Sequence, residues 1–304
     1  EEEVMIIGNP TTSLEMIVLL SAENFLMPEL PEVETMRRGI LAIEGAEITS
    51  VEKVRCSRKP ISILPNMATI RRRLIGKKVK AVGRIGKRVV IQMENDDRLL
   101  FEPRMTGLVL VADPPSQEHV RFRIEFSLGE KEVLYWDRRG LGLIYLLNPQ
   151  QYQDRFSLEN LGPDALDVTG PLLKSIFGKA RRPIKVALLD QKKVAGIGNL
   201  YASEILYVAG IHPAQRCDRI TLKQWNLIAQ TTIDILQTAI THEGSTLSDG
   251  TYRNALNDPG GYQNMHRVYD KEGQSCPLCI QTKITRIVQA QRSTFFCKAC
   301  QKRR

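Results

Sequence analysis

Four of the six cysteines stand at a spacing that could bind one metal ion. They form two Cys-x2-Cys pairs separated by 17 residues, namely Cys276, Cys279, Cys297 and Cys300. Each short pair can direct two thiolates at one ion, and the residues between the pairs suffice for a β-hairpin that brings both pairs together. Two disulfides are the alternative, but paired two-residue spacings suit a metal better. The sequence therefore predicts one structural Zn2+ ion in a closed four-thiolate site that does no chemistry.

A second candidate for chemistry is segment 27–35, which reads Met-Pro-Glu-Leu-Pro-Glu-Val-Glu-Thr. Pro31 suits the first position of a helix, and Glu32 and Glu34 complement the dipole at a helix start. An apolar stripe follows at helical spacing, made of Val33, Met36 and Ile40. On these grounds alone the segment is a well-capped helix.

The chain of 304 residues is basic, with a net charge of +9 and a pI near 9.3. Residues 1–26 hold five Glu and no Lys or Arg, whereas residues 271–304 hold eight basic residues against one Glu. This balance favours a polyanionic partner, nucleic acid first and an anionic membrane surface second, with solubility alone as the plain alternative. The longest uncharged apolar stretch, Met16 to Ala22, is far shorter than the roughly 20 residues that span a bilayer, so we expect no membrane span.

The periodicity of apolar residues divides the rest of the chain into two blocks. From Ile48 to Leu147, short apolar or alternating runs separated by Gly, Asn, Asp and Pro predict an antiparallel β-sandwich. The clearest runs are Val79–Val82, Arg88–Gln92, Leu99–Phe101, Arg121–Phe126 and Val133–Trp136. From Leu158 to His242 the period becomes helical, and a turn with two glycines, 194–199, leads into one helix with Asn199 as its expected N-cap. The predicted fold class is α+β with several domains.

From Met27 onward the sequence resembles the formamidopyrimidine-DNA glycosylase family over almost its whole length. Segment 28–35 is similar to the mature N-terminus of that family. Later segments agree in order and spacing, together with the four-cysteine pattern: 198–204 (Gly-Asn-Leu-Tyr-Ala-Ser-Glu), 209–213 (Ala-Gly-Ile-His-Pro) and 290–297 (Ala-Gln-Arg-Ser-Thr-Phe-Phe-Cys). The resemblance implies a catalytic β-sandwich with an opening helix at 28–150, a helix-two-turn-helix DNA-binding domain at 151–262 and a zinc-finger β-hairpin at 263–304. Damaged double-stranded DNA would bind between the lobes.

The resemblance also implies a base-excision repair enzyme that removes oxidised purines, 8-oxoguanine and formamidopyrimidines, and then cleaves the abasic site. Pro28 takes the place of the family's terminal proline, whose secondary amine attacks C1′ of the damaged nucleotide to form an iminium. Glu29 would be the acid and base that opens the sugar ring, with Glu32 supporting the amine nearby. Lys87 and Arg292 match active-site cations near the lesion phosphate. Both activities share one intermediate, because β- and δ-elimination follow from the iminium.

The DNA-binding residues of the family also map onto this chain. Asn199 and Arg292 match the residues that clamp the phosphates flanking the flipped nucleotide, and Lys185 is a weaker phosphate candidate. Met105 and Leu141 align with the apolar wedges that fill the vacated space. By the same alignment Arg139 faces the orphaned base.

Two loops depart from the family pattern. Residues 102–107 read Glu-Pro-Arg-Met-Thr-Gly where the family often reads His-Leu-Gly-Met-Ser/Thr-Gly. Residues 137–142 read Asp-Arg-Arg-Gly-Leu-Gly where Asp-Pro-Arg-Arg-Phe-Gly is common. Leu141 stacks on a base less well than Phe, so a change in opposite-base discrimination or in scanning efficiency is expected. Ordinary packing is the alternative role of Met105 and Leu141.

Residues 1–27 have no counterpart in the family pattern, yet they bear on the chemistry. If they stay attached, the Pro28 nitrogen is an amide without a usable lone pair. We expect translation to start at Met27 and the upstream residues to be a start-site artefact. The alternatives are a catalytically silent protein that binds lesion DNA, or a glycosylase of the sister branch for oxidised pyrimidines, which usually begins Pro-Glu-Gly-Pro-Glu, unlike Leu30 here.

Three expectations complete the interpretation. The protein would act as a monomer in the cytoplasm. A lesion-capping loop would lie within 245–261, where Gly, Ser, Asp and Asn are frequent and predict no fixed geometry.

Overall fold

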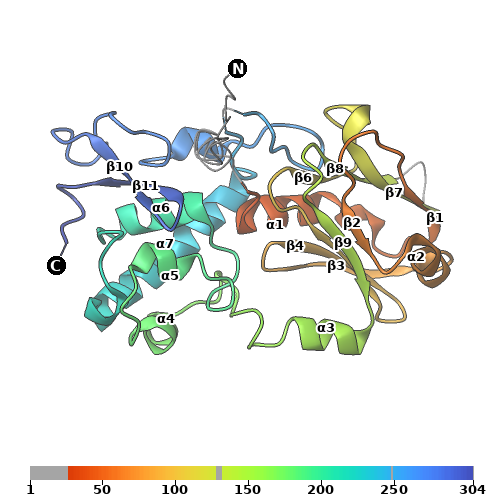
Figure 1. Cartoon of the computed structure of the whole chain (residues 1–304), viewed down its shortest axis with the longest axis horizontal. Helices are drawn as coiled ribbons and strands as arrows, with labels where there is room; N and C mark the ends of the chain where they lie inside the picture. The colour runs from red at the N-terminus through yellow and green to blue at the C-terminus, as the bar shows by residue number, and fades with distance from the viewer. Residues whose placement is uncertain (1–26, 128–131, 248, 304) are drawn as a thin grey trace, which may run out of the picture.

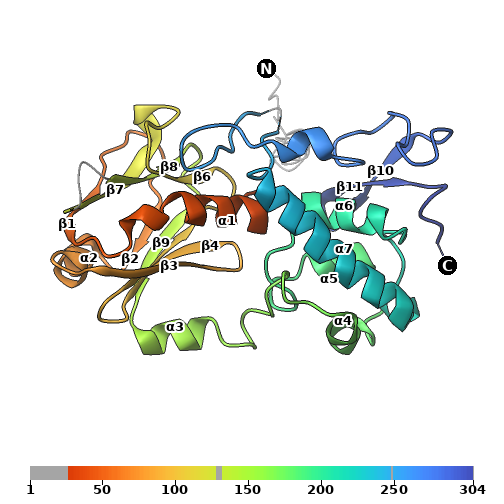
Figure 2. The ribbon, with the colours of Figure 1, turned by 180° about the vertical axis from the view of Figure 1, so that it is seen from behind.

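The computed structural model describes residues 27–127, 132–247 and 249–303, so the expected artefact at residues 1–26 lies outside the described part. Two lobes lie side by side, a β-sandwich and a helical lobe that carries a C-terminal hairpin, and a helix runs from one lobe to the other (Figure 1 and Figure 2). The predicted α+β fold class is confirmed. No described helix is both long and apolar enough to cross a bilayer.

The sandwich consists of two sheets whose strands agree with the predicted apolar runs. The four-stranded antiparallel sheet has the order β1 (Ile48–Lys53), β7 (Val120–Phe126), β8 (Glu132–Asp137) and β6 (Gly107–Leu110). The second sheet has the order β2 (Ser62–Leu64), β9 (Leu143–Leu147), β5 (Arg98–Glu102), β4 (Arg88–Met93) and β3 (Val79–Ile85), with only β2 and β9 parallel. Between them lies a core that includes Phe101, Phe122 and Tyr135, all fully buried.

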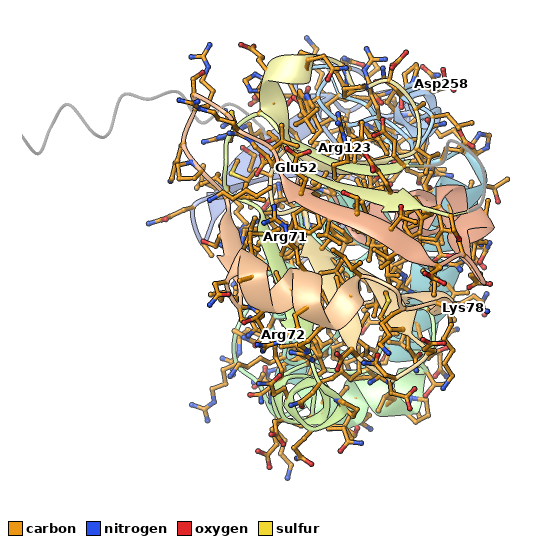
Figure 3. The ribbon with its side chains drawn as sticks, turned by 90° about the vertical axis from the view of Figure 1, so that its right-hand side faces the viewer. Glu52, Arg71, Arg72, Lys78, Arg123 and Asp258 are labelled. Atoms are coloured by element: carbon orange, nitrogen blue, oxygen red, sulfur yellow. The ribbon has the colours of Figure 1, made fainter. Side chains whose placement is uncertain are left out.

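Helix α2 (Met67–Leu74) closes the end of the sandwich remote from the helical lobe, as Figure 3 shows. The Arg71 Nε atom donates to the Val51 carbonyl oxygen at 2.9 Å and so ties α2 to β1. Glu52 on β1 and Arg123 on β7 are cross-strand partners on the same sheet (Figure 3). Opposite charges on neighbouring strands stabilise the pairing modestly.

Helix α1 (Leu30–Gly39) is the element that joins the lobes. It packs against β3, β4 and β6 on one side and against α7 (Leu222–Thr241) on the other. The helix begins one residue before the expected position, because Glu29 is the N-cap and Pro31 the second helical residue. Glu34 accepts hydrogen bonds from the Arg37 and Arg38 side chains of the next turn rather than serving only the helix dipole.

The helical lobe follows the predicted 3.6-residue pattern. Besides α7, its helices are α4 (Gly170–Phe177), α5 (Ile184–Leu188) and α6 (Asn199–Val208), whereas α3 (Pro149–Arg155) packs on β9 of the sandwich. Trp225 of α7 is fully buried and stacks on Phe177 of α4 with ring centroids 6.0 Å apart. Short 3-10 turns complete the described elements: Leu41–Ile43, Gln117–His119, Cys217–Arg219 and Tyr262–Met265. A single buried cluster continues from the sandwich into this lobe, so the lobes share one core.

The C-terminal hairpin pairs β10 (Ile284–Gln289) with β11 (Arg292–Cys297), and β11 lies against α6. Its turn is two residues long, Ala290 and Gln291, and both have a positive φ of 47° and 60°. Such a turn matches the twist of the flanking strands. It places Arg292 directly at the tip of the hairpin.

Candidate active site and DNA-facing loops

The functional residues of α1 are fixed where α1 meets the start of α6. The Leu30 N–H donates to the Gly196 carbonyl oxygen at 3.1 Å, so the predicted turn 194–199 holds the first turn of α1. The Gln191 side chain holds this turn with two hydrogen bonds: it accepts from Gly196 N at 3.0 Å and donates to Ile197 O at 2.8 Å. The N-cap of α6 is Gly198, one residue before the predicted Asn199.

Glu29 explains why glycine occupies that cap. Its carboxylate, 1% exposed, accepts from Gly198 N at 2.5 Å and from Leu200 N at 2.9 Å. A Cβ atom at position 198 would collide with the Glu29 carboxyl group. Burial raises the pKa of Glu29, while Lys87 and the two N–H donors oppose the rise. A carboxyl group in this setting can keep a proton nearer to neutral pH and donate it.

Glu32 lies one helical turn further and is fully buried. It accepts from Glu29 N at 2.9 Å, from the Tyr201 hydroxyl at 2.6 Å and from Ser245 N at 3.0 Å. Burial, followed by the neighbouring charge of Glu29, raises the pKa of Glu32 to about 7. Two adjacent carboxyl groups with raised pKa values can divide the roles of proton donor and proton acceptor.

A cavity of about 360 Å³ lies beside Gly198, the residue whose N–H binds Glu29. Its lining includes Pro28, Lys87, Glu102, Gly198 and Arg292. Three of the four predicted catalytic residues therefore meet there, whereas Glu29 is buried and binds the N–H of the lining residue Gly198. Lys87 follows Gly86, whose φ of +55° makes the tight turn between β3 and β4. Burial lowers the pKa of Lys87, Glu29 opposes this and the charge of Arg292 adds to it.

The predicted phosphate-binding residues lie beside this cavity, but not all are exposed. Lys185 is fully buried, and its Nζ donates to the Asn199 side chain and to Ser293 O, the latter at 3.1 Å. Burial, with the charge of Arg292, lowers the pKa of Lys185 to about 7. Arg292 itself is exposed and Asn199 half-buried. Lys185 thus fixes Asn199 against the hairpin, and a phosphate could reach it only if these groups moved.

The four predicted metal ligands converge below the hairpin. The ligand sulfurs of Cys276, Cys279, Cys297 and Cys300 all lie within 4.8 Å of one another. Cys276 and Cys300 are 3.8 Å apart, and Cys279 and Cys297 are 3.7 Å apart. A tetrahedral site with Zn–S bonds of about 2.3 Å requires sulfurs about 3.8 Å apart, whereas a disulfide needs about 2.05 Å. The sulfurs therefore fit one metal ion and not two disulfides.

Comparison with known proteins agrees with this geometry. The sequence model of the formamidopyrimidine-DNA glycosylase N-terminal domain matches residues 27–144, and that of its H2TH domain matches residues 161–251. The formamidopyrimidine-DNA glycosylase of Chloroflexus aurantiacus is 37% identical over 90% of this chain and 98% of its own length. That of Gluconobacter oxydans is 38% identical over 91% of this chain and its full length. The chain belongs to the formamidopyrimidine-DNA glycosylase family.

Solved structures lead to the same result. A complex of a Lactococcus lactis Fpg mutant with DNA containing Fapy-dG has a TM-score of 0.81 and 33% identity, covering 91% of this chain and all of that one. A complex of MutM with DNA containing carbocyclic 8-oxo-G has a TM-score of 0.80 and 33% identity, with the same coverage.

The two loops that depart from the family pattern lie next to each other. Met105 follows β5 and is half-buried, while Arg139 and Leu141 lie between β8 and β9, Arg139 exposed and Leu141 half-buried. The loops meet because β6 pairs with β8, where Gly107 is the partner of Asp137. Glu102 is held by Arg88 at 2.7 Å and Arg104 at 3.2 Å, so its carboxylate enters the cavity wall already paired.

The predicted capping loop has more fixed contacts than its composition indicates. The Ser245 N–H binds Glu32, and Tyr252 is buried with its hydroxyl donating to Glu243 O at 2.9 Å. Thr251 accepts from the Arg138 side chain at 2.7 Å. Ser248 is outside the described residues.

Sequence reasoning missed the groups that hold the site residues in place. Gln191 binds the turn before α6, and Glu32 is bound by Tyr201 and Ser245. Glu204 is fully buried on α6 and accepts hydrogen bonds from the backbone N–H groups of residues 267–269, which precede the hairpin. Tyr201 and Glu204 lie inside the matched segment 198–204. Tyr201 and Glu204 carry polar groups on a helix that is mostly apolar and buried, and this contrast in the sequence could have marked them as hydrogen-bonding residues.

Proposed function

We propose that this protein is a base-excision repair glycosylase that removes oxidised purines, 8-oxoguanine and formamidopyrimidines, from duplex DNA and then cleaves the abasic site. The observation that carries the proposal is one cavity at the start of α6 that is lined by Pro28, Lys87 and Gly198, where the Gly198 N–H is bound by the buried Glu29 carboxylate. Relatives with 37% and 38% identity over most of the chain carry the same enzyme name. Family structures with damaged DNA support the partner, since two contain Fapy-dG and 8-oxo-G analogues.

In this proposal Pro28 acts as a terminal secondary amine. Its nitrogen forms a bond to C1′ as the glycosidic bond breaks, and the base leaves with a proton. Glu29 supplies the proton that opens the sugar ring, because its burial favours the protonated form. The iminium that results makes the C2′ proton acidic, so its loss expels the 3′ phosphate, and a second elimination expels the 5′ phosphate. Glu32 fixes the backbone between Pro28 and Glu29 through the Glu29 N–H.

Binding of the damaged duplex is assigned to residues around the cavity. Lys87, Asn199 and Arg292 would bind backbone phosphates while the damaged base rotates out of the stack. Met105 and Leu141 would fill the vacated space, and Arg139 would face the orphaned base. We retain the predicted division into domains at 28–150, 151–262 and 263–304.

We also propose that the metal of the four-cysteine cluster is zinc. Four thiolates at tetrahedral separations leave no open position, as in structural zinc sites. The Tyr207 hydroxyl lies 3.1 Å from the Cys276 sulfur and would stabilise the thiolate as an outer partner. When bound, the metal would hold the hairpin that carries Arg292.

Trapping with borohydride tests the nucleophile. The chain beginning at Pro28 and the chain carrying residues 1–27 are each incubated with a duplex containing 8-oxoguanine opposite cytosine, then reduced. The shorter chain should form a covalent adduct, because reduction turns the iminium into a stable amine, and the longer chain should form none. Binding without an adduct by both chains would favour the silent lesion-binding protein. An equal yield from both chains would make another amine, Lys87 first, the nucleophile.

A further inference from the structure

The loops that carry Met105 and Arg139 are joined by one buried carboxylate. Asp137, fully buried at the end of β8, accepts from the Arg139 N–H at 3.1 Å through one oxygen and from the Gly142 N–H at 2.7 Å through the other. The first oxygen also accepts the Thr106 hydroxyl. One side chain therefore binds the residue after Met105 and both ends of the loop that carries Leu141.

The Thr106 hydroxyl makes this connection specific. Its oxygen accepts from the Arg139 N–H at 3.0 Å while its proton goes to Asp137, so the hydroxyl bridges the two loops. Thr106 is 1% exposed. Removing the hydroxyl would take one donor from the buried Asp137 oxygen and leave the Arg139 N–H as the donor to that oxygen, so the bond between the two loops would be lost.

Tyr135 leaves little room for other arrangements of the two loops. A Cβ atom at either Gly107 or Gly142 would collide with the Tyr135 hydroxyl, so both loops lie against the same phenol ring. The Asp137 carbonyl oxygen is held as well, by the Arg121 Nε at 2.8 Å. The backbone of the wedge loops is thus fixed although Arg139 is exposed and Met105 and Leu141 are only half-buried.

We propose that Asp137 is a positioning residue which, through Thr106, sets Met105, Leu141 and Arg139 as one rigid unit for insertion into the duplex. This inference rests on the proposed function, because it concerns the step in which the wedges replace the flipped nucleotide. When the loops are already rigid, less conformational entropy is lost on binding DNA, because the three side chains do not have to be ordered each time.

The test uses the full chain and two duplexes that contain a tetrahydrofuran abasic analogue. In one duplex the analogue lies opposite cytosine, and in the other it lies opposite a one-nucleotide gap, where no orphaned base has to be contacted. Dissociation constants are measured for Asp137→Asn and Thr106→Val, with Thr106→Ser as the variant that keeps the hydroxyl. Asp97→Asn removes another buried carboxylate of the same sandwich, one paired with Arg73 at 2.6 Å, and serves as the control for stability alone.

Asp137→Asn and Thr106→Val should weaken binding to the cytosine duplex about tenfold and to the gapped duplex about twofold or less, since a buried hydrogen bond to a charge is lost at the loops alone. Fluorescence of 2-aminopurine beside the analogue should rise less on binding, because the wedges enter incompletely. Thr106→Ser and Asp97→Asn should keep the wild-type ratio of the two affinities, although Asp97→Asn lowers Tm.

Equal losses on both duplexes, or no loss with either variant, would overturn the inference. If Asp137→Asn fails to fold, the comparison of Thr106→Val with Thr106→Ser decides the question. A wild-type chain that binds the abasic duplex no better than undamaged DNA would instead contradict the proposed function itself.

Discussion

The proposed catalytic corner and the proposed DNA-facing rim of this molecule are fixed by opposite means. The corner consists of Pro28, Glu29, Glu32 and Lys87, and the rim of Met105, Arg139, Leu141 and Arg292. In the corner the functional side chains themselves accept the hydrogen bonds, as Glu29 does from two N–H groups of α6. In the rim hydrogen bonds hold the backbone instead: Asp137 binds the loop of Arg139 and Leu141, and the hairpin register positions Arg292.

This difference predicts different responses to mutation. A change in the corner alters groups that are buried and mutually dependent, so it should affect one chemical step strongly. A change in the rim would remove one of several proposed contacts with the duplex, so it should affect affinity moderately.

The largest effect is expected for Glu29→Gln. Base excision from an 8-oxoguanine duplex should fall by roughly 10²–10⁴-fold, the usual contribution of general acid catalysis. Cleavage of a preformed abasic site should survive, because its hemiacetal ring opens to the aldehyde without a proton from Glu29. Single-turnover rates are measured on the 8-oxoguanine duplex and on the abasic duplex, and the ratio of the two rates is compared with that of the wild-type chain.

Glu204→Gln is the matched control for that variant. Glu204 is likewise buried and likewise accepts backbone N–H groups, but it lies outside the corner. It should lower Tm and leave the ratio of the two rates unchanged. An equal fall in both rates for Glu29→Gln would show that Glu29 has no separate role as an acid.

Loss of the metal should be next in size, because it removes a whole part of the rim. Cys297→Ser combined with Cys300→Ser should abolish detectable binding to lesion DNA and reduce bound zinc, while circular dichroism still shows the folded sandwich. Cys56→Ser, a half-buried cysteine outside the cluster, should keep both metal and binding. Retained lesion binding without zinc would contradict the assignment of Arg292 to the clamp.

Residues that the structure brings together could be found in the sequence more readily than the groups that hold them in place. The cysteine ligands could be found because their spacing is local, and the strands and helices because their apolar periods are strong. The burial of Lys185 could not, since it depends on Asn199 and Ser293 from distant parts of the chain. The helix cap at Gly198 was missed by one residue for a similar reason, because Glu29 supplies the acceptor from 169 positions away.

Glu32 should give a smaller and pH-dependent effect. Burial raises the pKa of Glu32 in the folded chain from 4.5 to about 7. Between pH 4.5 and pH 7 the folded state therefore binds a proton at Glu32 that the unfolded state has lost. This contribution to stability is complete below pH 4.5 and is lost as pH rises through 7, by roughly 3 kcal/mol at most. The pKa of Glu29 is also raised, so its contribution to stability likewise decreases as pH rises.

Thermal melting from pH 4.5 to 7.5 measures that slope. Glu32→Gln should flatten it, whatever its effect on Tm at a single pH. Glu34→Gln should leave the slope unchanged. Burial raises the pKa of Glu34, but the hydrogen bonds from Arg37 and Arg38 outweigh burial and lower it, so Glu34 titrates below this pH range. A slope unchanged by Glu32→Gln would mean that another group takes up the proton.

The smallest effect is expected at the tip of the hairpin, where Arg292 and Asn199 differ in charge but share the proposed phosphate role. Arg292→Ala should weaken lesion binding about tenfold and reduce the slope of log Kd against log salt by about one, because one cation fewer releases counterions. Asn199→Ala should weaken binding without changing the slope, since no charge is lost. Arg292→Lys sharpens the comparison: it keeps the charge and so the slope, but a single ammonium cannot meet two phosphate oxygens as the guanidinium fork does, so affinity should still fall. An unchanged slope for Arg292→Ala would remove Arg292 from the DNA-facing rim.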